Sequence, residues 1–422
     1  MKTTIIEVVE HEAIFVNADQ GIDQKSFDQL EGLILNLNEA EADTDQVIDF
    51  LTLSTKRDVG KVIRAKNYVG VLKATDHLQL EILPKIHGVD KQKTKLILLE
   101  MLKTLFDFPS KTFNSADLAT EEMPLFEIFI CLYIKEVHQL VRRGLQSDYY
   151  DEEDNVTVYK GKMNFSKHIR HNLVHKERFY VEFDEFGINR VENRLIKKVL
   201  LYLNVMTKSE VNRIAIKQIL HHFDPVDESK VTESDMRRLQ ISRNMAHYEN
   251  SITWAKIFLS KQSFTSFAGA QSMVSMLFPM EKLFESYVGN MLRQLLHQSD
   301  WNVALQDRRY HLFKDKFALR PDIVLRNKAQ NRTVVIDTKW KKLSASKHNY
   351  GISQSDMYQM YAYAKKYGSK EIFLMYPFHD FLGIDQDTIC FNSDDGINVS
   401  IAFIKCECIV DGLNEFIQKY LK

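Results

Sequence analysis

The sequence Arg320-Pro-Asp-Ile-Val-Leu is followed, after a short polar segment, by Val334-Val-Ile-Asp-Thr-Lys339. Both stretches are runs of aliphatic, mostly β-branched residues, as in buried strands, and each carries an aspartate at one end. If the two strands pair as a hairpin through residues 326–332, Asp322, Asp337 and Lys339 converge on one point, because side chains two apart on a strand share one face. We therefore predict a β-hairpin with two carboxylates and an amine at its open end.

These residue types fit metal-assisted cleavage of a phosphodiester. Carboxylates are the hard oxygen ligands that Mg²⁺ prefers, so we expect Asp322 and Asp337 to bind this ion. Lys339 would orient the attacking water or stabilise developing negative charge. A lone Asp-Xaa-Lys triplet is usually a solvated strand end, and one also occurs at Asp23-Gln-Lys25. The second carboxylate at hairpin distance makes the set far more specific than the triplet.

Two flanking helices carry further candidates. A helix is expected over Met280 to His297, where Glu285 could supply a third oxygen to the metal; an exposed helix carboxylate is an equally good interpretation. A second helix, over Ser353 to Tyr367, places Gln359 and Tyr363 four residues apart, on one face. We expect Gln359 to support the catalytic residues and Tyr363 to contact DNA, although core packing explains a helical tyrosine equally well.

Cations surround these acidic residues. Between Arg308 and Lys347 the sequence has twelve Lys or Arg residues and three acids, two of which are the proposed metal ligands. Such a zone suits a phosphodiester backbone, although an ordinary solvated charged face is the alternative. The candidates for nucleic-acid contacts are Arg320, Arg326, Lys341, Lys342 and Tyr363.

The pattern along the chain predicts an α/β multidomain protein of three parts. Residues 1–110 read as a β-rich or α+β domain, with a hairpin over Tyr68 to Ile86. Residues 111–265 read as a mainly helical middle domain with a β excursion over Asp148 to Gly187. In residues 266–422 strands alternate with helices, which indicates an α/β core.

Composition excludes several classes of protein. The net charge is −1, so contact with nucleic acid must come from a local basic face. The four cysteines form neither a disulfide framework nor a zinc knuckle, which favours a reducing cytoplasm. No signal-length or membrane-spanning apolar run is present, so no membrane partner is expected. The phosphate-binding loop Gly-x-x-x-x-Gly-Lys-Ser/Thr is absent, so we expect the chain itself to bind no nucleotide.

The ordered set Glu285, Arg-Pro-Asp322, Ile-Asp337-Thr-Lys339 and Gln359-x-x-x-Tyr363 resembles the PD-(D/E)xK nuclease superfamily. The chain is more specifically similar to the McrC family, the nuclease subunits of McrBC-type modification-dependent restriction systems. The further matches are Tyr68-Val-Gly70, Leu80-Glu-Ile-Leu-Pro-Lys85-Ile, Lys160-Gly161-Lys, Phe183-Asp184-Glu185 and Asn193-Arg-Leu-Ile-Lys197.

The resemblance implies a division of labour typical of phage-defence systems of type IV. This chain would be a Mg²⁺-dependent DNA endonuclease, and a separate AAA+ GTPase subunit of McrB type would read the site and translocate. Residues 1 to about 150 would engage and stimulate the GTPase. Two alternatives stay open, namely a catalytically silent adaptor that activates the GTPase ring and a solitary DNA-repair nuclease.

Overall fold

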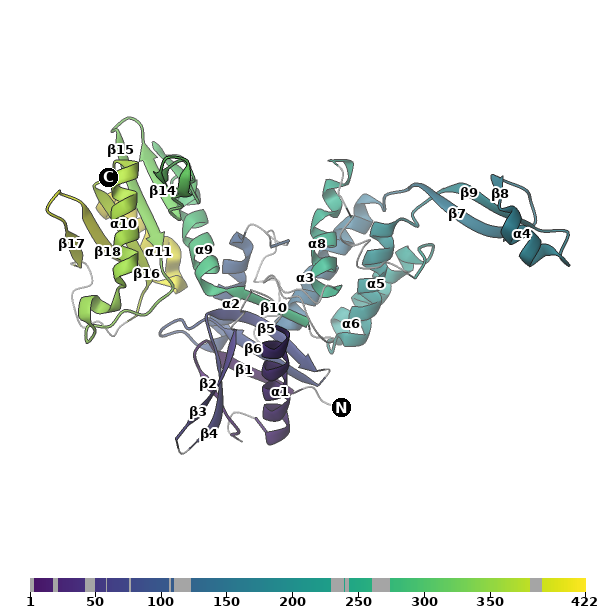
Figure 1. The fold of residues 1–422 in the computed structure, drawn as a ribbon, viewed down its shortest axis with the longest axis horizontal. Helices are drawn as coiled ribbons and strands as arrows, with labels where there is room; N and C mark the ends of the chain where they lie inside the picture. Colours follow the sequence, from purple (N-terminus) through teal and green to yellow (C-terminus); the bar gives the residue numbers. More distant parts are fainter. Residues whose placement is uncertain are drawn as a thin grey trace. The chain divides into compact units, whose positions relative to one another are not determined.

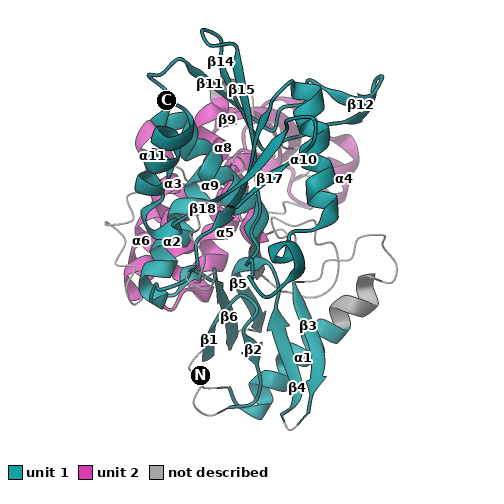
Figure 2. Cartoon of the chain, turned by 90° about the vertical axis from the view of Figure 1, so that its left-hand side faces the viewer, with its two compact units in different colours: residues 1–125, 262–422 teal, residues 126–261 magenta. Residues whose placement is uncertain are grey.

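The computed structural model describes residues 4–17, 22–41, 50–57, 59–75, 77–105, 108–109, 123–228, 239, 243–259, 274–379 and 389–422 (Figure 1). The chain divides into two compact units (Figure 2). Met1–Leu125 and Gln262–Lys422 together form unit 1, and Phe126–Lys261 forms unit 2. The division of the chain into three domains stays a prediction. Among the described residues, no helix combines the length and apolar character needed to cross a bilayer.

The N-terminal stretch of unit 1 builds two small sheets. Its elements are β1 (Thr4–Val9), β2 (Ala13–Ile14), α1 (Gln24–Glu41), β3 (Leu51–Lys56), β4 (Gly60–Ala65), β5 (Tyr68–Thr75), β6 (Leu78–Leu83) and α2 (Lys91–Thr104). The hairpin predicted over Tyr68 to Ile86 is confirmed as β5 and β6. One sheet has the order β2-β4-β3. The other has the order β1-β6-β5-β10, and its last strand, β10 (Val274–Pro279), comes from the stretch of unit 1 that follows unit 2 in the sequence.

The approach of β10 to β5 requires a glycine. Leu277 is paired with Gly70, whose φ is +128°. A Cβ atom on Gly70 would lie 2.0 Å from the carbonyl oxygen of Met276, much closer than any real contact. Gly70 therefore permits the close backbone contact through which the two distant stretches of unit 1 share one sheet.

Unit 2 is a helical unit that carries a β arm. Its elements are α3 (Leu125–Arg143), β7 (Asp148–Val156), β8 (Lys162–Met163), α4 (Phe165–Asn172), β9 (Phe179–Gly187), α5 (Val191–Met206), α6 (Glu210–Leu220), the 3-10 turns η3 (His221–Phe223) and η4 (Arg243–Tyr248), and α8 (Glu249–Leu259). Aromatic rings fill its core, where Trp254 stacks on Phe258 at 5.6 Å between ring centroids. The predicted β excursion is present as the arm β7-β9-β8 with α4.

The C-terminal stretch of unit 1 is a mixed six-stranded sheet flanked by helices. Its elements are α9 (Met280–Leu295), β11 (Trp301–Leu305), β12 (His311–Phe313), β13 (Lys316–Ala318), β14 (Ile323–Asn327), β15 (Arg332–Thr338), η5 (His348–Gly351), α10 (Gln354–Tyr367), β16 (Glu371–Pro377), β17 (Cys390–Asn392), β18 (Asn398–Ile404), η8 (Cys406–Cys408) and α11 (Ile409–Tyr420). The strand order is β11-β14-β15-β16-β18-β17, with β15, β16 and β18 parallel. The expected α/β core is thus present.

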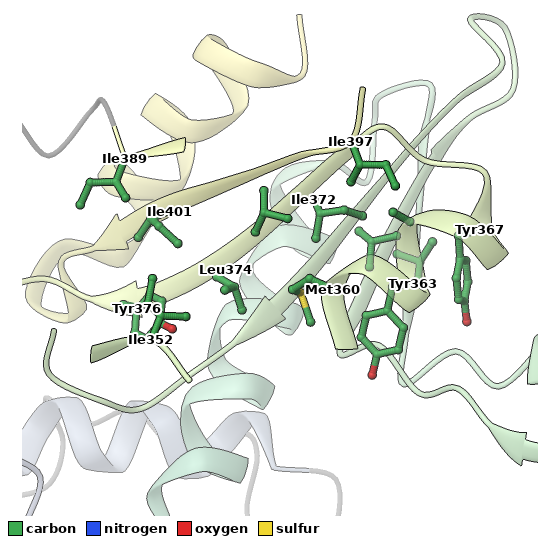
Figure 3. Close-up of a cluster of buried hydrophobic side chains, with 14 of the residues drawn as sticks. Ile352, Met360, Tyr363, Tyr367, Ile372, Leu374, Tyr376, Ile389, Ile397 and Ile401 are labelled. Atoms are coloured by element: carbon green, nitrogen blue, oxygen red, sulfur yellow. The ribbon is translucent and has the colours of Figure 1, made fainter. Parts of the chain in front are cut away.

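Successive side chains of β16 point to opposite faces of the sheet. In β16, Ile372, Leu374 and Tyr376 join the buried cluster beneath α10, which Figure 3 draws. Phe373 points the other way and contacts Phe416 of α11 at 4.9 Å between centroids. Both faces of the sheet are therefore covered. This packing holds β15, and the carboxylate of Asp337 near its end, in a defined position.

The helix α10 has strong signals at both ends. Ser353 accepts a hydrogen bond from the Asp356 amide, and the Asp356 side chain accepts one from the Ser353 amide, which is a capping box. The helix ends at Gly368, in the left-handed conformation with φ +62°. These caps explain why the helix predicted over Ser353 to Tyr367 has nearly those bounds.

We predict that Gly70→Ala destabilises unit 1 by about 3 kcal/mol or more, because the new methyl group collides with the β10 backbone. Gly60→Ala is the control. Its φ of +85° is also left-handed, but nothing lies within 4 Å of the added Cβ atom. Strain alone should then cost about 1–2 kcal/mol. Urea unfolding of both variants measures the difference, and equal losses would contradict the close contact.

Candidate active site

The predicted hairpin is confirmed, and its register places the two aspartates opposite each other. Ile323 of β14 is paired with Ile336 of β15, so Asp322 and Asp337, the next residues outward, lie at the same end of the hairpin. The Asp322 carbonyl also accepts a hydrogen bond from the Gln306 amide at 2.8 Å, which ties this end to β11. The two carboxylates are thus held by the backbone of a three-stranded segment.

Thr338 fixes the orientation of Asp322. Its amide and its hydroxyl both donate to Oδ2 of Asp322, each at 2.7 Å. Burial raises the pKa of Asp322, and the two Thr338 hydrogen bonds act in the opposite direction. The sequence offered only one signal for this role, the position of Thr338 between Asp337 and Lys339.

Asp337 and Lys339 form a buried ion pair. Nζ of Lys339 lies 2.6 Å from Oδ2 of Asp337, whose side chain is 2% exposed. At this distance the ammonium lies directly against the carboxylate oxygen. Burial, together with the charge of Asp322, raises the pKa of Asp337 to about 7. Burial acts to lower the pKa of Lys339, but the carboxylates of Asp337, Asp322 and Asp356 together outweigh it and raise that pKa.

Glu285 brings a third carboxyl group to the same place. It projects from α9 and is partly buried. Burial and then the charge of Asp322 raise the pKa of Glu285 to about 8, and Asp337 contributes in the same direction. The structure therefore brings together Glu285, Asp322, Asp337 and Lys339, while their chemical roles stay predictions.

The helix α10 contributes from the other side. Gln359 donates to the Tyr363 hydroxyl at 2.7 Å, and Tyr363 is 2% exposed within the cluster of Figure 3. A side chain this deeply buried favours the packing interpretation of Tyr363 over a DNA contact. The carboxylate of Asp356, in the first turn of the same helix, lies 4.0 Å from the Lys339 ammonium.

The candidate nucleic-acid contacts are not all close to the carboxylates. Arg320 is exposed and lies beside Asp322. Arg326 lies four residues further along β14 and is paired with Asp307 at 2.9 Å. Lys341 and Lys342 are exposed after β15, and Lys341 donates to the Gly351 carbonyl at 2.6 Å. The geometry thus favours Arg320 and gives no support to Arg326.

A cavity of about 930 Å³ opens beside the carboxylates. Glu285 and Asp322 lie in its wall, together with the cations Lys282, Arg293 and Arg320. Sequence reasoning did not single out Lys282 or Arg293. Their spacing from Glu285 was the available signal, because residues three or four apart, and eight apart, lie near one face of a helix.

The residues fit a bound Mg²⁺ ion. Within the described part of the chain, no three His, Cys, Asp or Glu side chains are arranged to hold a metal by themselves. Mg²⁺ does not need such a cage, because it is commonly held by one or two carboxylates, with waters and substrate phosphates completing its shell. Asp337 Oδ2 is a buried carboxylate oxygen of this kind, and the Lys339 ammonium 2.6 Å away shows that positive charge is stabilised there.

The chain matches a known family over most of its length. The model of the family described as "McrBC 5-methylcytosine restriction system component" matches residues 63–377. The chain therefore belongs to this family of restriction-system components, as the motifs predicted. No curated protein sequence matches the chain.

Two solved structures with similar folds come from Thermococcus gammatolerans. One is described as a half-complex from a tetradecameric assembly of McrB AAA+ hexamers with bound McrC; the matching chain is 19% identical, with a TM-score of 0.68, over 98% of this chain and 100% of that one. The other is described as the McrBC complex; the matching chain is 23% identical, with a TM-score of 0.51, over 69% of this chain and 88% of that one.

We predict that the metal-free protein loses stability as pH rises from about 4.5 towards 8. The pKa values of Glu285 and Asp337 are raised to about 8 and about 7, so the folded protein binds more protons than the unfolded chain in this window. Raising the pH removes that advantage and charges the buried groups.

Unfolding in EDTA across this pH range measures the slope. Glu285→Gln and Asp337→Asn should each flatten it, because the amide does not titrate. Glu281→Gln, on the exposed face of the same helix, is the matched control and should keep the wild-type slope. A wild-type slope in both site variants would contradict the proposed carboxylate cluster.

Proposed function

We propose that this chain is the DNA-cleaving subunit of a GTP-dependent restriction complex, with a Mg²⁺-dependent, PD-(D/E)xK-like centre. The observation that carries the proposal is the position of half-buried Asp322 opposite buried Asp337 at the end of one hairpin, with the Lys339 ammonium 2.6 Å from Asp337. Two buried carboxylates beside each other are costly unless a cation is nearby. A centre of this kind suits cleavage of a phosphodiester.

Each side chain has a task in this proposal. Asp322 and Asp337 would hold the metal, with Glu285 as a further ligand of the ion or its water. When bound, Mg²⁺ supplies positive charge that polarises a phosphate oxygen and makes water more acidic. Lys339 keeps its proton and stabilises negative charge that develops on the phosphate. Thr338 holds Asp322 in position, and Gln359 supports Tyr363 behind the carboxylates.

The cavity beside the carboxylates offers a place for the DNA backbone. Lys282, Arg293 and Arg320 line it together with the amide of Asn290. Cations that neutralise phosphates supply binding without base recognition, so this wall would position the strand while another subunit selects the site.

A separate AAA+ GTPase subunit of McrB type is the proposed partner. One of the similar Thermococcus gammatolerans structures contains McrB AAA+ hexamers with bound McrC, and this sequence shows no phosphate-binding loop. The arm of unit 2 leaves many large apolar side chains exposed, which suits contact with another protein. They are Tyr149, Val158, Tyr159, Phe165, Ile169, Leu173, Val174 and Phe186. Residues 1 to about 150 stay the part expected to stimulate the GTPase.

Two alternative functions are separated from this one by experiment. A silent adaptor would activate the GTPase without cutting, and a solitary repair nuclease would cut without GTP. The presence of both aspartates and the lysine in one partly buried cluster favours a working centre over the adaptor.

We predict that Asp337→Asn and Lys339→Ala each lower the rate of DNA cleavage by about 10²–10³-fold or more. The first weakens metal binding by removing a charged ligand, and the second removes positive charge that stabilises the reacting phosphate. The assay uses methylated and unmethylated plasmid with Mg²⁺, with and without the co-encoded GTPase and GTP. Lys366→Ala is the control, since this lysine is exposed on α10 and is not among the candidate metal or DNA contacts.

Each outcome separates the functions. Cleavage that requires the partner and GTP and is lost in both variants supports the restriction subunit. Cleavage without GTP supports the solitary nuclease. GTPase stimulation without any cleavage supports the adaptor, and full cleavage by Asp337→Asn places the centre elsewhere.

We also predict that Lys282→Ala, Arg293→Ala and Arg320→Ala weaken DNA binding about equally for all sequences. Each should reduce the slope of log Kd against log salt concentration by about 1, which is the contribution of one phosphate contact. Lys366→Ala, an exposed lysine of α10 outside the cavity, is the control. Titration of labelled duplex at several salt concentrations, with Ca²⁺ in place of Mg²⁺, measures the slopes, and unchanged slopes would remove the cavity from the DNA path.

A further inference from the structure

Trp340 lies between the two segments that carry the catalytic candidates. It directly follows Lys339 in sequence, and it is 8% exposed. Its ring contacts Phe284 at 5.3 Å between centroids, and Phe284 directly precedes Glu285 on α9. A shift of this indole would therefore move Lys339 and Glu285 together.

The indole is held by a carboxylate from the N-terminal sheet. Trp340 Nε1 donates to Oε1 of Glu10 at 2.6 Å, across 330 residues of sequence. Glu10 directly follows β1, and its amide donates to the Leu83 carbonyl at 2.9 Å. The same Oε1 accepts a hydrogen bond from the Lys85 amide at 2.9 Å. Glu10 is thus fixed by the sheet and in turn fixes Trp340.

Burial of the Glu10 carboxyl group lowers the stability of the fold. It is 1% exposed, and its second oxygen, Oε2, has no hydrogen-bond partner. A buried polar atom without a partner costs about 1–3 kcal/mol, so packing alone does not explain a carboxyl group here. Burial raises its pKa to about 7, as expected for a group removed from water.

A second connection joins the same sheet to the centre. Strand β10 lies at the edge of the sheet beside β5 and continues directly into α9, whose first amide, that of Met280, donates to the Asn67 carbonyl at 2.9 Å. The sheet therefore sets the start of the helix that carries Glu285, while Glu10 sets the residue after Lys339.

We propose that Glu10 is a positioning residue of the nuclease centre, which acts through Trp340 to place Lys339 and Glu285 in their working geometry. The inference rests on the nuclease function proposed above. It makes the N-terminal sheet part of the catalytic apparatus, so that a displacement of β1 relative to β15 lowers cleavage without removing any catalytic residue.

The test compares the same substitution at two buried tryptophans. Trp340→Phe keeps the ring and removes the hydrogen bond to Glu10. Trp301→Phe removes an equivalent bond, from an indole also 8% exposed, to the Leu421 carbonyl at 3.1 Å. We expect Trp340→Phe to lower kcat for plasmid cleavage by the complex with GTP about five- to tenfold with little change in KM, and Trp301→Phe to leave both unchanged.

Glu10 variants provide the rescue. Glu10→Gln retains an oxygen that can accept both hydrogen bonds and should retain most of kcat, whereas Glu10→Leu should lose it as Trp340→Phe does. Stimulation of the partner GTPase reports assembly of every variant, and the melting temperature reports its folding. If Glu10→Leu fails to fold, the kcat of Trp340→Phe alone tests the positioning role.

Three results would overturn the inference. Wild-type kcat in Trp340→Phe, beside an inactive Asp337→Asn, refutes the positioning role and leaves the nuclease function standing. Equal losses in Trp340→Phe and Trp301→Phe show a general effect of stability. Absence of cleavage by the wild-type complex removes the nuclease function and this inference with it.

Discussion

Like charges in a shared buried pocket repel one another, and the arrangement of the candidate centre follows from this repulsion. Asp322 and Asp337 are placed side by side by the hairpin register, and Glu285 approaches from α9. The Lys339 ammonium and the Thr338 hydrogen bonds offset part of the cost. The pKa values of the three carboxyl groups nevertheless stay above their ordinary range. A cation that binds beside these carboxyl groups relieves their repulsion and so stabilises the folded protein. Binding sites are commonly built in this way, at the expense of the stability of the unliganded fold.

The strain is tolerable because the surrounding scaffold is rigid. The hairpin lies inside a six-stranded sheet whose two faces are covered, with Ile372 and Leu374 beneath α10 and Phe373 against α11. The helix α10 is capped at both ends, and α9 continues directly from a paired strand. Side chains on such elements cannot relax away from one another, since close-packed interiors do not yield to small forces.

Local patterns predicted the hairpin, α9 and α10 because their signals lie within short windows, in β-branched runs, caps and helical spacing. They could not identify the partner of β10, because pairing between strands two hundred residues apart depends on the assembled sheet rather than on either strand alone. The bond from Trp340 to Glu10 was hidden for the same reason. The ion pair of Arg326 with Asp307, nineteen residues away, could not be read from the sequence, so Arg326 was predicted to contact DNA. The burial of Tyr363 likewise depends on how α10 packs against the sheet.

The position of β10 has a consequence for biosynthesis. Its sheet begins with Thr4 and gains its last strand only with Pro279, after all of unit 2 has been made. While the ribosome is still translating that insertion, β5 presents an unpaired edge of backbone donors and acceptors, the kind of surface that recruits other chains. A truncated N-terminal fragment would keep this edge permanently. Fragments meant to carry the N-terminal sheet alone therefore need β10 supplied in cis, for example by a circular permutation that joins it to the strand it covers.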